Sequence, residues 1–351
     1  MIMLFSVRRL TLTTGRKQID QGCLMNNSKI MLNILSDESN ILNARILKEL
    51  GPLQDPTTML PAEGRALSLK VNARCNIDLP PMVNVADVWL EADPVLGSAR
   101  CRLKVLVPPE AQAGAILFVH GGGFAFCSPE THERCARVLA IESGMPVVLP
   151  DYRLAPENPY PAGLLDVIAA LRSLFEVTAA ANISRGPLII AGDSAGANLA
   201  LAAMLYEHDE ARAMPDGALL FYGNYAHQFN TPSYERFSDG PGLTRAKMQR
   251  YWAFYAGQQD IADDPLACPL VARDDALAAL PPLYLLAAAV DPLLSDTLSL
   301  HERLEAVGRD DDFHIVPGVV HGFLQNTREL AAARKALEGA GRAARQFSIQ
   351  Q

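Results

Sequence analysis

Residues 188–205 read LIIAGDSAGANLALAAML, and three features of this stretch occur in a fixed order. A short apolar run typical of a buried strand leads into Gly192-Asp193-Ser194-Ala195-Gly196, and helix-forming residues follow. Strand, G-x-S-x-G and helix together are the context of a nucleophile elbow, a sharp turn that exposes its serine. Glycines flank the serine because bulkier residues would clash in such a turn. The stretch therefore predicts that Ser194 is a nucleophile.

A serine hydroxyl attacks poorly unless a base takes its proton and a carboxylate orients that base. After an elbow of this kind the acid and then the histidine follow, near the ends of later strands. Asp291 comes directly after the apolar run 283–290, and His321 lies shortly after a predicted strand over 313–316. The order Ser194, Asp291, His321 predicts a catalytic triad.

Other acids and histidines fit these roles less well. The rivals lie in a predicted helix or strand or among the aromatic residues near 225–262: Asp296, His208, His227, His301 and His314. His132-Glu133 begins like the zinc motif H-E-x-x-H, but Ala136 stands where the second histidine is required. No metal site is expected.

A glycine-rich loop, His120-Gly121-Gly122-Gly123, follows the apolar run 115–119. When a carbonyl is attacked its oxygen becomes an anion, and each N–H donor aimed there is worth roughly 10²–10³ in rate. Gly122, Gly123 and Ala195 are the predicted donors of this oxyanion hole. A tight turn or a nucleotide loop is the alternative for three glycines, but the chain continues with phenylalanines instead of completing G-x-G-x-x-G.

Together these motifs resemble the hormone-sensitive-lipase-like branch of the α/β-hydrolases, also called bacterial family IV esterases. The resemblance covers about residues 80 to 345 and rests on five motifs in the family's order: HGGG at 120–123, DYRLAPE at 151–157, GDSAG at 192–196, DPL at 291–293 and HGF at 321–323. It implies an α/β-hydrolase fold, with a central, mostly parallel eight-stranded sheet flanked by helices and a helical cap. It also implies a serine carboxylesterase for short- to medium-chain esters that needs no cofactor.

The resemblance also implies roles for single residues. Ser194 is expected to be the nucleophile, His321 the general base and acid, and Asp291 the acid that orients it. The motif 151–157 is expected to be structural, and Asp193 a supporting residue. We expect aromatic side chains near the motifs to line an acyl pocket: Phe124, Phe126 and Phe323.

Alternating strand and helix patterns from about 82 to 191 predict a parallel sheet covered on both faces. Within this part, Ser128-Pro129 predicts the start of a helix and Gly144 its end. Two stretches break the alternation: 35–80, which suggests helices alone, and 225–262, which is rich in aromatic residues.

We interpret these two stretches as parts of a cap, although aromatic residues of this kind also form ordinary helix cores. The catalytic core is then expected over 81–224 and 263–351, and residues 1–34 are expected to be a disordered extension.

The composition limits the remaining choices. The 351 residues carry a formal net charge of −8, with 49% hydrophobic and 20% charged residues, which argues against a disordered chain and a nucleic-acid binder. No apolar run is long enough for a membrane span. Six scattered cysteines favour a reduced, cytoplasmic protein over a disulfide framework.

Several alternatives stay open at this point. An amidase, a deacetylase or a lactone hydrolase would use the same triad, so the motifs do not separate them from an esterase. A non-catalytic receptor for small molecules is disfavoured because His321 is present. Relatives often pair through an edge strand and the last helix, so a homodimer fits the resemblance, although the helix expected over 327–347 is equally compatible with a solvated surface.

Overall fold

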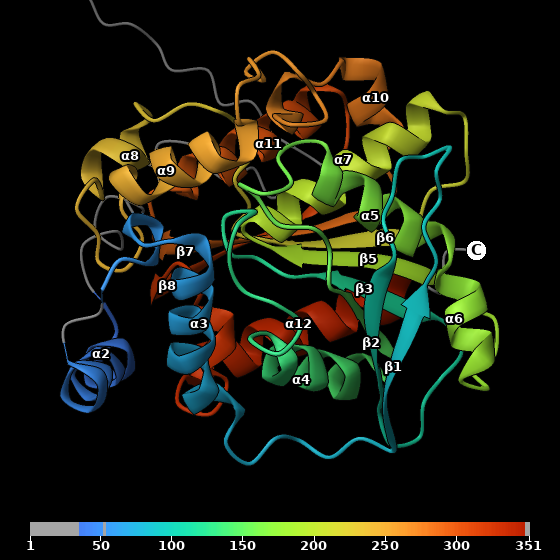
Figure 1. The fold of residues 1–351 in the computed structure, drawn as a ribbon, viewed down its shortest axis with the longest axis horizontal. Coiled ribbons are helices and arrows are strands. Elements are labelled where there is room, and N and C mark those ends of the chain that lie inside the picture. Colours follow the sequence, from blue (N-terminus) through green and yellow to red (C-terminus); the bar gives the residue numbers. More distant parts are fainter. Residues whose placement is uncertain (1–34, 52–53, 348–351) are drawn as a thin grey trace, which may run out of the picture.

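The computed structural model describes residues 35–51 and 54–347, so the predicted extension 1–34 lies outside the described residues. Within them, eight strands form one sheet in the order β1-β2-β4-β3-β5-β6-β7-β8 (Figure 1). The pairs β1–β2 and β2–β4 are antiparallel, and every other neighbouring pair is parallel. The predicted eight-stranded, mostly parallel α/β-hydrolase sheet is confirmed.

The strands are β1 (Asn84–Leu90), β2 (Cys101–Val107), β3 (Ala115–Val119), β4 (Val147–Pro150), β5 (Leu188–Asp193), β6 (Gly217–Phe221), β7 (Leu283–Val290) and β8 (Asp312–Val320). Continuous apolar runs form the central strands because both faces of the sheet are covered. In β3, for example, Leu117 packs into the core on one face and Ile116 into the core on the other, and both are fully buried.

The main helices are α4 (Glu133–Ser143), α5 (Ala162–Arg172), α6 (Leu174–Ala180), α7 (Ala195–Asp209), α10 (Asp274–Ala278), α11 (Leu294–Ala306) and α12 (Ala331–Phe347). Short 3-10 turns lie at η3 (Pro269–Val271) and η4 (Phe323–Asn326). Helices α5, α7, α10 and α11 pack on one face of the sheet, and α4 and α12 on the other (Figure 1). No helix within the described residues has the length and apolar content needed to cross a membrane.

The predicted helix start at Ser128-Pro129 is wrong, whereas its predicted end is confirmed. Helix α4 begins at Glu133, and Gly144 ends it in the left-handed conformation at φ 72°. Ser128 instead opens a tight turn, in which the Thr131 hydroxyl donates to the Ser128 carbonyl and accepts from its N–H, at 2.8 and 3.0 Å. These local bonds satisfy the backbone without a helix.

The last strand, β8, extends four residues beyond the predicted 313–316. Its pairing with β7 shifts register here, since Ala288 faces Val316 but Val290 faces Val320. The extra residues on β8 include Pro317 and Gly318, two residue types that in a sequence usually indicate the end of a strand. A proline is tolerated here because β8 is the edge strand and its outer side has no partner strand among the described residues.

The described residues of the two stretches expected to form a cap contain several helices and no strand of the sheet. The first stretch contains α2 (Asp37–Leu50), η1 (Pro56–Thr58), α3 (Pro61–Asn72) and η2 (Ala73–Asn76), and the second contains α8 (Pro232–Arg236) and α9 (Arg245–Ala256). Arg250 of α9 joins the two, because it donates to the Thr57 hydroxyl at 2.6 Å and to the Asp55 carboxylate. Figure 1 shows α3 and α9 at the same end of the molecule.

Some aromatic residues of the second stretch belong to the internal core. Four of them are almost fully buried and join the main apolar cluster: Tyr225, Tyr234, Trp252 and Tyr255. The ordinary core explanation therefore holds for this part of the aromatic set.

Candidate active site

The turn between β5 and α7 holds Ser194 in a strained backbone conformation. Its φ of 56° and ψ of −122° lie where L-residues are rarely found, and its N–H donates to the Phe221 carbonyl of β6 at 2.9 Å. Glycine is required at position 196, since a Cβ there would lie 1.9 Å from the Val119 carbonyl oxygen. The start of α7 thus packs directly on β3, and the serine stands at the carboxyl end of the sheet.

The structure brings together the three residues predicted as a triad. His321 Nε2 lies 2.9 Å from Ser194 Oγ, and His321 Nδ1 lies 2.7 Å from Asp291 Oδ2. Asp291 directly follows β7 and His321 directly follows β8, so each of the three sits at the end of a different strand.

Burial and hydrogen bonding define how these groups share protons. Asp291 is fully buried, and its other oxygen accepts the Leu293 N–H at 2.9 Å. Because a carboxylate only accepts, the proton shared with His321 belongs on Nδ1, and Nε2 is left to accept from the Ser194 hydroxyl. The arrangement can therefore take a proton from Ser194.

The predicted oxyanion-hole donors have no recorded acceptor within the described protein. Across residues 35–51 and 54–347, no protein acceptor receives the N–H of Gly122, Gly123 or Ala195. Gly122 and Gly123 have φ values of 117° and 59°, which favour glycine. The Tyr251 ring lies so close to Gly123 that a Cβ there would be 2.2 Å from it. Helix α9 therefore covers the loop.

A buried network that the sequence did not reveal connects this loop to the elbow. Asp193 Oδ1 accepts the Gly121 N–H at 2.8 Å and lies 3.1 Å from His132 Nε2. Burial by itself would raise the pKa of Asp193, but the neighbouring His132 and the hydrogen bonds hold it below its usual value. The expected supporting role of Asp193 fits this position. In the sequence, His132 is part of an incomplete zinc motif, and no local signal links it to Asp193.

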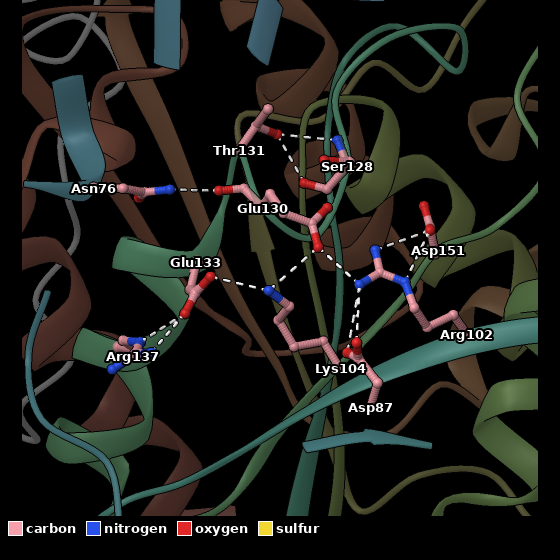
Figure 2. Close-up of polar contacts among 10 residues, drawn as sticks. All are labelled: Asn76, Asp87, Arg102, Lys104, Ser128, Glu130, Thr131, Glu133, Arg137 and Asp151. Atoms are coloured by element: carbon pink, nitrogen blue, oxygen red, sulfur yellow. Dashed lines mark hydrogen bonds and ion pairs between the residues drawn. The ribbon is translucent and has the colours of Figure 1, made fainter. Parts of the chain in front are cut away.

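Charged side chains also hold the turn that follows the glycine loop (Figure 2). Glu130 lies 2.8 Å from Arg102 and 3.2 Å from Lys104, both on β2, and Lys104 also contacts Glu133 at 3.0 Å. Burial acts to raise the pKa of Glu130, but hydrogen bonds, first from Arg102, lower it to about 2. Arg102 further bonds Asp151, the first residue of the DYRLAPE motif, at 3.0 Å. The motif thus has a structural role at this residue.

The three aromatic residues expected at an acyl pocket lie in three different clusters of buried residues. Phe124 stacks on Tyr255 with ring centroids 3.8 Å apart, Phe126 packs edge-on against Tyr251, and Phe323 packs near Tyr222 on the other face of the sheet. Their role in substrate binding stays a prediction.

The rival residues have other partners. Asp296 lies in the first turn of α11, where its buried carboxyl accepts the N–H groups of Tyr225 and Ala226 at 2.8 and 3.3 Å. Burial raises its pKa to about 8. His314 lies in β8 as predicted, and its Nε2 is 2.8 Å from Asp312. Within the described residues, no group of three or more His, Cys, Asp and Glu side chains is arranged to hold a metal ion.

Comparison with known proteins gives consistent matches. A family model described as alpha/beta hydrolase fold matches residues 116–325. Esterase LipI of Mycobacterium tuberculosis is 32% identical over 265 residues, which cover 74% of this chain and 82% of LipI. An acetyl esterase of Salmonella schwarzengrund is 32% identical over 241 residues, covering 68% of this chain and 74% of that protein.

Solved structures of esterases share the fold over most of the chain. The ester-hydrolase EH1AB1 from the metagenome of Lake Arreo superposes with a TM-score of 0.81 at 29% identity, over 89% of this chain and 99% of its own. The hyperthermophilic esterase of Pyrobaculum calidifontis gives a TM-score of 0.81 at 28% identity, over 90% and 99% of the two chains.

Proposed function

The chain belongs to the α/β-hydrolase fold family, in its hormone-sensitive-lipase-like branch, and from this membership we propose that it hydrolyses short- to medium-chain carboxylic esters through an acyl-enzyme on Ser194. It is a carboxylic ester hydrolase. One observation carries the proposed mechanism: the two successive hydrogen bonds from Ser194 through His321 to Asp291, at 2.9 and 2.7 Å. The names of the acetyl esterases among the relatives support a short acyl group.

The proposed reaction has two similar halves. Ser194 Oγ attacks the ester carbonyl carbon while its proton moves to His321 Nε2, and the carbonyl oxygen becomes an anion held by the N–H groups of Gly122, Gly123 and Ala195. The bond to the alcohol then breaks, and the alcohol leaves with the proton from His321. Water repeats these steps on the acyl-enzyme and releases the acid. Asp291 holds the histidine tautomer and stabilises the imidazolium without taking the proton.

We propose that residues 35–80 and 225–262 form a cap and that 81–224 and 263–351 form the catalytic core. The contact of Arg250 with Asp55 and Thr57 supports treating the two cap stretches as one unit. The contact of the Tyr251 ring with Gly123 supports placing this cap over the glycine loop.

We also propose a cytoplasmic homodimer that binds no nucleic acid. The five described cysteines are free, which suits a reducing compartment, and the net charge of −8 disfavours binding to phosphates. Strand β8 at the sheet edge, with α12 beside it, offers a surface for a second copy. Light scattering of the purified protein tests the dimer, and a monomer at micromolar concentration would contradict it.

The decisive experiment compares wild type and Ser194→Ala on p-nitrophenyl esters of increasing acyl length. We expect wild type to cleave the short esters and the activity of the variant to fall near background. Ser173→Ala is the matched control, because the one recorded partner of its hydroxyl in the described part of the chain is the Ala169 carbonyl of the preceding helix. Anilides and lactones in the same panel separate amidase and lactonase activity. Full activity of Ser194→Ala, or no ester cleavage by wild type, would refute the proposal.

A further inference from the structure

The loop that carries the proposed oxyanion donors needs support from outside. Four of its residues have positive φ: Gly122 and Gly123, followed by Phe124 at 62° and Cys127 at 67°. The last two are not glycines, so the loop holds a conformation that L-residues rarely adopt, and such strain persists only where the surroundings enforce it. Within the loop the backbone bonds are few, such as Phe126 N–H to the Gly122 carbonyl at 2.9 Å.

One side chain of the proposed cap bonds directly to this loop. Arg65 of α3 donates from Nε to the Ala125 carbonyl and from Nη2 to the Ala155 carbonyl, each at 2.9 Å. Both alanines are buried. The Ala155 N–H donates to the Phe124 carbonyl, also at 2.9 Å. Arg65 thus links the glycine loop, through Ala125, to the 151–157 segment, through Ala155. The Ala155–Phe124 backbone bond already joins the same two segments.

The guanidinium is itself fixed in place. Arg65 Nη1 and Nη2 contact the two carboxylate oxygens of Glu157 at 3.0 and 2.5 Å, which is a bidentate pair. The hydrogen bond from Arg65 lowers the pKa of Glu157, which favours the charged carboxylate. Only an arginine has donors in a rigid fork that reach two carbonyls and a carboxylate together, whereas a lysine presents a single point charge.

We propose that Arg65 is a positioning residue: through the Ala125 carbonyl it fixes the loop whose N–H groups form the oxyanion hole, and it thereby couples the cap to turnover. The inference rests on the proposed function. Arg65 acts on the transition state through the loop and makes no contact with the reacting atoms. Its loss should therefore lower kcat and leave KM nearly unchanged, because donors that act only in the transition state affect the rate and not ground-state binding.

The test compares Arg65→Met, Arg65→Lys and Glu157→Gln with wild type on p-nitrophenyl acetate. We expect Arg65→Met to lower kcat by about tenfold or more, since small misplacements in an active site cost up to about 10²-fold. Arg65→Lys should be intermediate. Glu157→Gln should have the smallest effect, because both carbonyl bonds of Arg65 remain.

A second measurement separates positioning from plain stability. A trifluoromethyl ketone forms a tetrahedral adduct whose oxyanion occupies the hole, so its Ki should rise by the same factor by which kcat/KM falls. Arg74→Met is the matched control: Arg74 of η2 also joins the proposed cap to the core, through Glu329 at 3.3 Å and the Asn326 side chain, but it does not touch the loop. It should lower the melting temperature without changing kcat in the folded enzyme.

Three outcomes would refute the role of Arg65 as a positioning residue. If folded Arg65→Met keeps kcat within twofold of wild type, if KM rises at constant kcat, or if Arg74→Met loses as much kcat, the inference is wrong. If Arg65→Met does not fold, Arg65→Lys is judged by the same criteria. Wild type without any esterase activity would refute the proposed function and this inference with it, whereas active wild type with an equally active Arg65→Met refutes the inference alone.

Discussion

Replacing Asp291 with asparagine is expected to lower kcat by about 10⁴, or about 5.4 kcal/mol, while the protein stays folded. Part of the effect follows from the Leu293 N–H, which points at one oxygen of Asp291 from 2.9 Å. The amide oxygen of the asparagine must stay there, since turning the amide would oppose two donors and cost about 1–3 kcal/mol. Its NH₂ group then faces His321.

An NH₂ group facing His321 Nδ1 requires that nitrogen to accept, and the ring proton moves to Nε2. There it points at Ser194 from 2.9 Å and blocks the transfer that the reaction needs. This tautomer bias accounts for about 10- to 100-fold of the loss. The rest comes from removing the negative charge 2.7 Å from the nitrogen that becomes part of an imidazolium.

The assay is steady-state hydrolysis of p-nitrophenyl acetate, with Ser194→Ala defining the background. Asp312→Asn is the control, because it changes another carboxylate paired with a histidine, at 2.8 Å from His314 on β8, and should leave kcat unchanged. The reasoning is refuted if Asp291→Asn retains a tenth or more of the wild-type kcat, or if Asp312→Asn loses as much.

Three further predictions concern stability. Arg153→Met removes both guanidinium hydrogen bonds, each 2.8 Å, from the buried Asp166 carboxylate and leaves it only backbone donors, the Ala99 N–H among them. The loss of the counter-charge should lower the free energy of unfolding in urea by about 3–5 kcal/mol, with kcat of the folded enzyme intact; a loss below about 1 kcal/mol contradicts this. His120 is buried, and burial lowers its pKa to about 3, so the free energy of unfolding of wild type should fall by up to about 1.4 kcal/mol per pH unit as pH falls below 6.5. His120→Gln should lose less, and equal slopes of urea-derived unfolding free energy against pH for the two proteins would argue against this. Asp296 has the opposite pH dependence: its pKa is raised from 3.8 to about 8, so its contribution to stability is complete below pH 3.8 and is lost as pH rises through 8. The stability of Asp296→Asn relative to wild type should therefore increase over that range, and a constant difference in melting temperature would count against the assignment.

The sequence predicted those parts of the fold and site that depend on local patterns. Residues 188–191 and 283–290 are continuous apolar runs because β5 and β7 are buried on both faces. The elbow was readable because its sharp turn demands glycine at position 196. The order of Ser194, Asp291 and His321 followed from the strands that they terminate.

The missed features depend on contacts between distant segments. Nothing near Ser128 in the sequence shows that Thr131 closes a turn there, so a helix was expected. Pro317 hid the full length of β8, because only the position of that strand at the sheet edge makes a proline acceptable. The bond from Arg65 to the Ala125 carbonyl spans 60 residues and is not encoded by any spacing rule.

His321 follows β8, which among the described strands pairs with β7 alone, whereas Ser194 follows β5 in the middle of the sheet. Edge elements open locally at a lower free energy than the centre of a domain. Activity should therefore disappear on heating before the global unfolding transition, and backbone amides of β8 should exchange with solvent faster than those of β5. The highest temperature at which the enzyme stays active is then set by the local stability of β8. Substitutions that stabilise β8, or a second copy bound to it, would raise that temperature.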